Sequence, residues 1–87
     1  MFDGRHCTQK DLDLLVKKTN EIMFSISNED ISGLDVYLSF IARFDRDIES
    51  TMRSQIRYAK DTASILNIIH RNIAELKQNV IVDINEH

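Results

Sequence analysis

The stretch TASILNIIHRNIAELKQ, residues 62–78, decides how this chain must fold. Its apolar residues recur at helical spacing and extend a stripe that begins upstream, made of Ile56, Ala59, Ala63, Leu66 and Ile73. Further apolar residues lie beside that stripe: Ile65, Ile69 and Leu76 on its flank and Ile68 further round. The whole set covers more than half of the helix circumference, whereas a helix with one neighbour presents an apolar stripe of about 100°. The surplus face therefore needs cover.

Composition limits where that cover can come from. With 87 residues the chain forms one small domain, and domains of this size usually need a disulfide, a metal or a partner for stability. Cys7 is the single cysteine, so an internal disulfide is excluded. The sequence has no proline and two glycines, which favours a few long helices with little loop. A protein partner is the remaining source of stability.

Charge and hydropathy exclude several functions. Eleven basic and 14 acidic residues give a net charge of −3, and acidic side chains are interleaved with the basic ones, so nucleic acid is not an expected partner. No stretch approaches the roughly 18 apolar residues of a membrane span. The first ten residues lack the apolar core of a secretory signal, and the sequence therefore predicts a cytoplasmic protein.

The first helix is predicted over 9–26, after a disordered start at 1–7. Thr8 and Asp11 have the spacing of a capping box, in which a side chain at each position satisfies a free backbone N–H group of the other. Leu15, Ile22 and Ile26 then mark one helix face. The segment SISNED that follows competes with helix, which predicts a turn at 27–32, with a short extra helical turn at 28–31 as an alternative.

A second helix is predicted over 33–79, because neither proline nor glycine interrupts the pattern after Gly33, and residues 80–87 are predicted to be a tail. Helix one would be about 27 Å long and helix two about 69 Å, so an antiparallel hairpin leaves the second half of helix two uncovered. A break near FDRDIES, which would fold that half back and give three helices, is the alternative. The predicted fold class is all-α: an antiparallel helical hairpin with a short first and a long second helix, completed by a partner or a dimer.

The surplus face is the predicted partner-binding site. Its residues are Ile65, Ile68, Ile69, Ile73 and Leu76. An interface with a different protein, the core of a homodimer and an intramolecular core all account for such a face. Each fully exposed isoleucine or leucine would forgo about 1.5–3 kcal/mol of stabilisation by burial, so the face should be covered. An interface with a different protein is the preferred interpretation.

No motif for catalysis, cofactor binding or metal binding is present, and the protein is predicted not to be an enzyme. His6 and Cys7 lie near Asp3 but have no second ligand cluster, so they do not predict a metal site. His70 falls between Leu66 and Ile73, which is typical of a boundary or core histidine, and general acid–base chemistry would need a second group beside it.

The segment ASILNIIHRNIAELK resembles the C-terminal helix of the small E-type co-chaperones of bacterial type III secretion needles, the YscE/EscE/SsaE group. The matching positions are Ala63, Ile65, Ile68, Ile69, His70, Leu76 and Lys77. The resemblance covers about fifteen residues. This chain departs from the family in its greater length, its early turn and its tail VIVDINEH.

The resemblance implies a helical hairpin that pairs with a tetratricopeptide-type chaperone. In such a pair, the two proteins hold the needle subunit soluble and monomeric in the cytoplasm before export. The surplus face would then be the surface that docks on the chaperone. The alternative function is a self-associating, homodimeric helical or coiled-coil protein, structural or regulatory, that has no client. A helical regulator of an enzyme or polymerase is a third hypothesis.

Overall fold

The computed structural model describes residues 6–82 of the chain. Its elements, in order, are β1 (His6–Cys7), α1 (Gln9–Ser27), α2 (Leu34–Ala42), α3 (Arg46–Arg57), α4 (Thr62–Asn79) and β2 (Ile81–Val82). The fold is all-α apart from the two-residue strands, as the sequence predicts. The predictions for residues 1–5 and 83–87, the outer parts of the predicted start and tail, concern positions outside the described residues.

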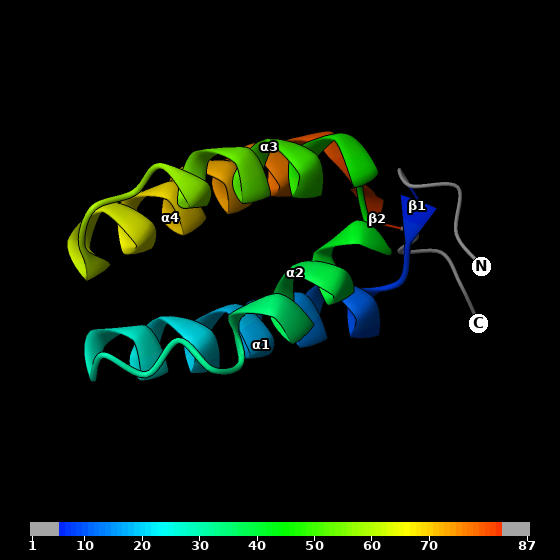
Figure 1. Ribbon diagram of the computed structural model, residues 1–87. Helices are drawn as coiled ribbons and strands as arrows, with labels where there is room; N and C mark the ends of the chain where they lie inside the picture. Colours follow the sequence, from blue (N-terminus) through cyan, green and yellow to red (C-terminus); the bar gives the residue numbers. More distant parts are fainter. Residues whose placement is uncertain (1–5, 83–87) are drawn as a thin grey trace.

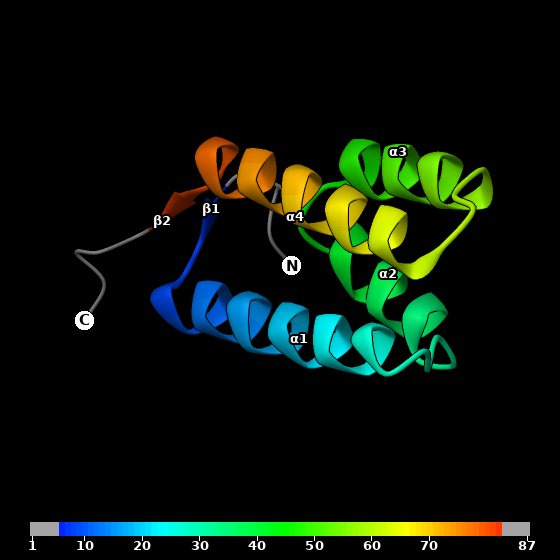
Figure 2. The same ribbon diagram turned by 90° about the vertical axis from the view of Figure 1, so that its left-hand side faces the viewer.

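The helices form two layers (Figures 1 and 2). One layer contains α1 and α2, and the other contains α3 and α4. Each helix packs against the next along the chain, and α4 returns to pack against α1. The predicted hairpin of one short and one long helix is therefore replaced by four helices, in which the second half of the chain covers the first.

Two breaks interrupt the helix predicted over 33–79, at 43–45 and at 58–61. Both end in an aspartate with extended backbone. The side chain of Asp45 accepts hydrogen bonds from the N–H groups of Asp47 and Ile48, at 2.9 and 3.1 Å. The side chain of Asp61 accepts one from the N–H group of Ser64 at 2.8 Å, and this bond is the largest factor that lowers the pKa of Asp61. Each aspartate is an N-cap, which starts a new helix after the break.

Residues 6–7 were predicted to be disordered and residues 81–82 to belong to a tail, but in the structure these two segments pair with each other. Strand β1 pairs with β2 in parallel, with His6 opposite Ile81 and Cys7 opposite Val82. Cys7 is only 3% exposed, and Val80 packs against the core. Residues 6 and 7 are therefore ordered by the opposite end of the chain, and residues 81 and 82 do not fray. A sequence window cannot show this pairing, because its partners are more than seventy positions apart.

The first helix begins and ends with defined hydrogen bonds. Thr8 and Asp11 form the predicted capping box, with each side chain bonded to the other residue's N–H group. At the other end the N–H groups of Glu29 and Asp30 donate to the carbonyls of Ile26 and Ser25, which is the Schellman arrangement. Glu29 occupies the left-handed position of this motif, with φ of 63°, where glycine is usual.

The core lies between the layers and receives side chains from all four helices. Its fully buried members are Leu15, Ile26, Ile41, Met52, Ile69 and Leu76. Phe40 and Phe44 form an edge-to-face pair at the α2–α3 junction, with ring centroids 5.2 Å apart. This single core includes the second half of the helix predicted over 33–79, which was expected to have no cover from its own chain.

Candidate functional site

The chain itself buries most of the predicted partner-binding face. Ile69 and Leu76 are fully buried, Ile73 is 4% exposed and Ile65 is 9% exposed, all within the common core. Ile68 is half-buried. The premise that this face has nothing in its own chain to pack against is wrong, because α4 packs against both α1 and α3. Of the three interpretations, the intramolecular core describes this conformation.

The error has a structural cause. The predicted apolar stripe runs through Ile56, Ala59, Ala63 and Leu66 only if these residues belong to one continuous helix. The turn at 58–61 ends α3, so the helical phase of α4 is independent of that of α3. The inward face of α4 is consequently formed by residues that were predicted to lie on the flank of the stripe: Ile65, Ile69 and Leu76. Ala63 and His70 point outward and are exposed. His70 is therefore neither a core nor a boundary residue.

Polar groups in the interior are paired. The hydroxyls of Thr19 and Tyr37 lie 2.8 Å apart and link α1 to α2, and burial raises the pKa of Tyr37 to about 12. The Asn72 side-chain amide donates to Gln55 Oε1 and to the Ile68 carbonyl, both at 2.8 Å, and links α4 to α3. Among the described residues, no buried side-chain nitrogen or oxygen lacks a hydrogen bond. These groups stabilise helix packing.

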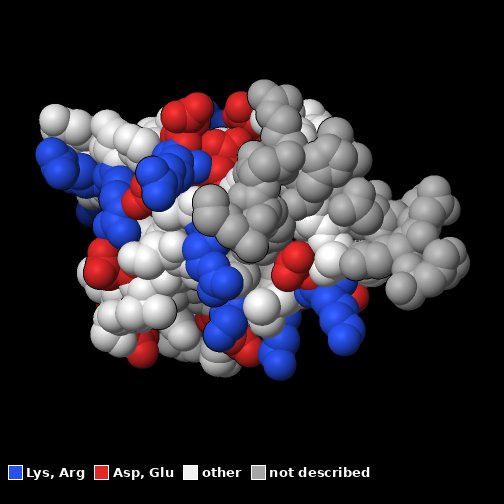
Figure 3. Space-filling view, turned by 90° about the vertical axis from the view of Figure 1, so that its right-hand side faces the viewer, with Lys and Arg blue, Asp and Glu red and all other residues white. Residues whose placement is uncertain are grey.

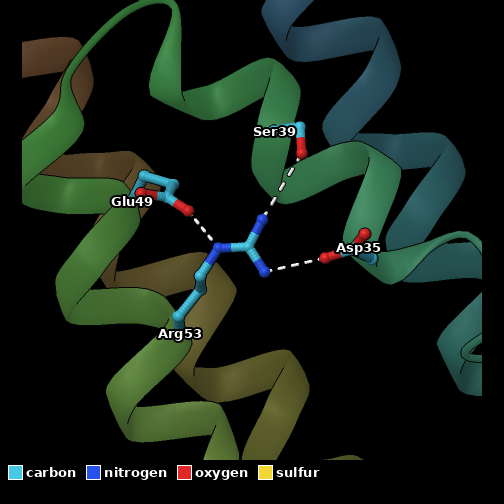
Figure 4. A network of polar contacts seen from close by, with 4 residues as sticks. All are labelled: Asp35, Ser39, Glu49 and Arg53. Carbon is cyan, nitrogen blue, oxygen red and sulfur yellow. Dashed lines mark hydrogen bonds and ion pairs between the residues drawn. The ribbon is translucent and has the colours of Figure 1, made fainter.

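Arg53 is the centre of a polar network on the outside of the α2–α3 layer contact (Figure 4). Its guanidinium donates to Asp35 Oδ1 at 2.8 Å, to Ser39 Oγ at 3.4 Å and to Glu49. The bonds to Asp35 and Glu49 raise the pKa of the guanidinium. Glu49 and Arg53 lie one helical turn apart on α3, and the network extends from this pair across to α2. Each of the three guanidinium nitrogens donates to a partner within the chain, so the network links α2 to α3.

Figure 3 shows the face at the β1–β2 end, where Lys and Arg side chains alternate with Asp and Glu. Among the described residues, no three His, Cys, Asp or Glu side chains are grouped as metal ligands. No helix in the same part of the chain has the length and apolar character to cross a membrane.

Apolar exposure is concentrated at the opposite end. Both views place the turns 28–33 and 58–61 on the side away from β1 and β2, one in each layer, and in Figure 1 the turn 28–33 runs back from the end of α1 to the start of α2 (Figures 1 and 2). We call this the turn end: the two turns with the adjoining last turn of α1 and first turn of α2. Six large apolar side chains of the described residues are exposed, and four belong to the turn end: Phe24 (71%), Ile31 (53%), Val36 (73%) and Tyr58 (77%). The other two, Leu14 and Val16, are about 40% exposed on the first half of α1.

Sequence reasoning missed the turn end, although part of the signal was present. Phe24 lies on the side of α1 opposite to Leu15, Ile22 and Ile26, so its exposure follows from the helical period. Tyr58 could not be found in this way, because a continuous helix has no end at that position. Its exposure depends on the break that follows α3.

Comparison with protein-family models, with curated proteins and with solved structures gave no significant match. The class that the fold and surface define is a small all-α protein with two helical layers, closed by pairing of its two ends.

Proposed function

We propose that this protein acts by binding another protein through the turn end, and that it catalyses no reaction. The observation that carries the proposal is that four of the six exposed large apolar side chains of the described residues belong to that end: Phe24, Ile31, Val36 and Tyr58. Single exposed apolar residues are normal on protein surfaces, but a group at one end that includes two aromatic rings is typical of an interface.

The energetics favour burial of this group. Each large apolar side chain gains about 1.5–3 kcal/mol when it moves from water into a packed interface. Tyrosine is among the residues that dominate binding energy, since its ring supplies apolar area and its hydroxyl supplies a hydrogen bond. Tyr58, at 77% exposure, has most of that area available.

The needle co-chaperone role, which the resemblance of residues 63–77 implies, is a narrower candidate for the same activity. Ala63, His70 and Lys77, three of the matching positions, are exposed on the outer side of α4 and are accessible to a tetratricopeptide-type chaperone. The matching positions Ile65, Ile69 and Leu76 could contact a chaperone only after α4 leaves the core. If α4 stays packed in the core, a complex with the chaperone and the needle subunit would have to use the outer side of α4 or the turn end.

The test places a photo-activated cross-linking residue at Tyr58, and separately at His70 as a matched exposed position outside the turn end. In the cell of origin, adducts with a protein are expected from position 58 and not from position 70. Tyr58→Asp and Phe24→Asp should weaken the captured complex by about tenfold or more and leave the melting temperature unchanged. Adducts from position 70 alone would move the site to the outer side of α4. Retention of full binding by both aspartate variants would refute the turn end as the site.

A further inference from the structure

The turn end has opposite charges on its two turns. The turn 28–33 carries Glu29 and Asp30, both exposed, and no basic residue. The other turn is flanked by Arg57 and Lys60, both exposed, beside the capping carboxylate of Asp61. We call these the acidic lip (Glu29 and Asp30) and the basic lip (Arg57 and Lys60). Each lip adjoins an exposed apolar residue, Ile31 or Tyr58.

We propose that the partner of the turn end is a second copy of this chain, bound end to end about a two-fold axis. A two-fold axis exchanges the same patch between copies, so the acidic lip of each copy faces the basic lip of the other. Ile31 and Tyr58, the exposed apolar residues that adjoin the two lips, then lie between the copies. This inference rests on the proposed function, because it names the occupant of the same surface.

The charges of both lips are free to act between molecules. Among the described residues, the ion pairs are those of Arg53 with Asp35 and Glu49, and none joins the two lips. Complementary charge across an interface steers association and fixes the orientation of the partners. In the other orientation, the two acidic lips would face each other and the two basic lips would face each other. The repulsion between like charges disfavours that orientation.

The size of the surface sets the expected affinity. The Cα trace measures 44 × 22 × 19 Å, so the cross-section of one end is roughly 400 Å², about half of the ~800 Å² that each partner buries in a standard interface. We therefore expect a weak dimer that forms in the micromolar-to-millimolar range and weakens as salt is added.

Charge reversal tests the pairing. Variant one carries Arg57→Glu and Lys60→Glu, which makes both lips acidic. Variant two carries Glu29→Lys and Asp30→Asn, which makes both lips basic and keeps an Oδ1 acceptor for the Ser32 N–H and hydroxyl groups that Asp30 binds. Sedimentation of the wild type up to about 1 mM should show a concentration-dependent dimer. Each variant alone should dimerise at least about tenfold more weakly, and an equimolar mixture should form the heterodimer.

A further variant separates folding from association. Glu29→Gly removes one charge of the acidic lip and suits the left-handed backbone at this position, so it should weaken the dimer while the melting temperature rises. A wild type that stays monomeric at about 1 mM overturns the inference. The inference is also overturned if each charge variant alone dimerises as strongly as the wild type. If a wild-type monomer still cross-links to a different protein from position 58, the proposed function holds and the second copy is wrong. If position 58 captures nothing and its aspartate variant changes nothing, both are wrong.

Discussion

The inward face of α4 and the turn end are both rich in apolar residues, but only one of them is covered. On α4 the chain returns over Ile65, Ile69, Ile73 and Leu76 through two turns that begin new helices. At the turn end no element of the described chain lies beyond the turns, as Figure 1 shows. Apolar content alone therefore does not identify an interface. The positions of the helix breaks decide which apolar residues become core and which stay in water.

The largest expected effect concerns the covered region. Ile69→Asp buries an unpaired carboxylate at a fully buried position, which costs several kcal/mol, comparable to the total stability of a small domain. The variant should unfold at 25 °C, as measured by far-ultraviolet circular dichroism. Phe24→Asp adds the same charge at a 71% exposed position and should leave the melting temperature within a few degrees of wild type.

Asn67→Asp provides a control on α4 itself, because residue 67 is exposed on the outer side of the same helix. It should fold as the wild type does. If Ile69→Asp stayed folded and only lost a partner, the inward face of α4 would be an interface after all, and the comparison would reverse.

The second effect is pH-dependent and concerns the α1–α2 link that covers the core. Burial raises the pKa of Tyr37 from 10.0 to about 12, so the folded state keeps the phenol proton where the unfolded state releases it. The contribution is fully present below pH 10 and is lost as pH rises from 10 to about 12, by up to roughly 2–3 kcal/mol. Urea unfolding at pH 9 and pH 11.5 measures this loss.

Tyr37→Phe should reduce the alkaline loss, at the cost of about 1 kcal/mol near neutral pH, because Thr19 loses its hydroxyl partner. Tyr58→Phe, at the exposed turn end, is the matched control and should retain the alkaline loss. An identical alkaline profile for wild type and Tyr37→Phe would show that this hydroxyl is not what makes the covered region pH-sensitive.

The third effect concerns the breaks. Asp45→Ala removes the acceptor of the Asp47 and Ile48 N–H groups and should destabilise the protein by about 1 kcal/mol. Asp45→Asn keeps an acceptor and should restore most of that stability. Asp61→Ala should destabilise in the same direction. If Asp45→Ala raised both helix content and stability, the long continuous helix would be the preferred state of this segment.

The sequence predicted the all-α class and the capping box at Thr8, because each depends on residues within four positions. The sequence offered a break near FDRDIES as an alternative, which is where α3 begins, but it did not predict the break at 58–61. Both breaks have a local signal, since Asp45 and Asp61 are good N-cap residues. The strand pairing of Cys7 with Val82 and the packing of α4 on α1 depend on distant residues and could not be read from periodicity. Because the break at 58–61 was not predicted, the helical phase expected for the last helix was wrong, and the binding of a partner by Ile65, Ile68, Ile69, Ile73 and Leu76 stays a prediction.

The smallest expected effect concerns the backbone of the turn end. Glu29 has a φ of 63°, in the region where a side chain costs roughly 1–2 kcal/mol and glycine costs little. Glycine also makes the unfolded chain more flexible, so Glu29→Gly should raise the free energy of unfolding by only about 0.5 kcal/mol. Lys18→Gly, at an exposed position inside α1, should lower it by a similar amount because no strain is relieved there. Urea titrations of both variants beside wild type measure the difference.

A gain for Glu29→Gly would show that the turn end retains a charged residue at a position where glycine is more stable. The inward face of α4 differs, because its buried isoleucines contribute to stability. A loss for Glu29→Gly would mean that the glutamate side chain stabilises the α1–α2 turn, and the turn end would then be a structural element of the same kind as the core.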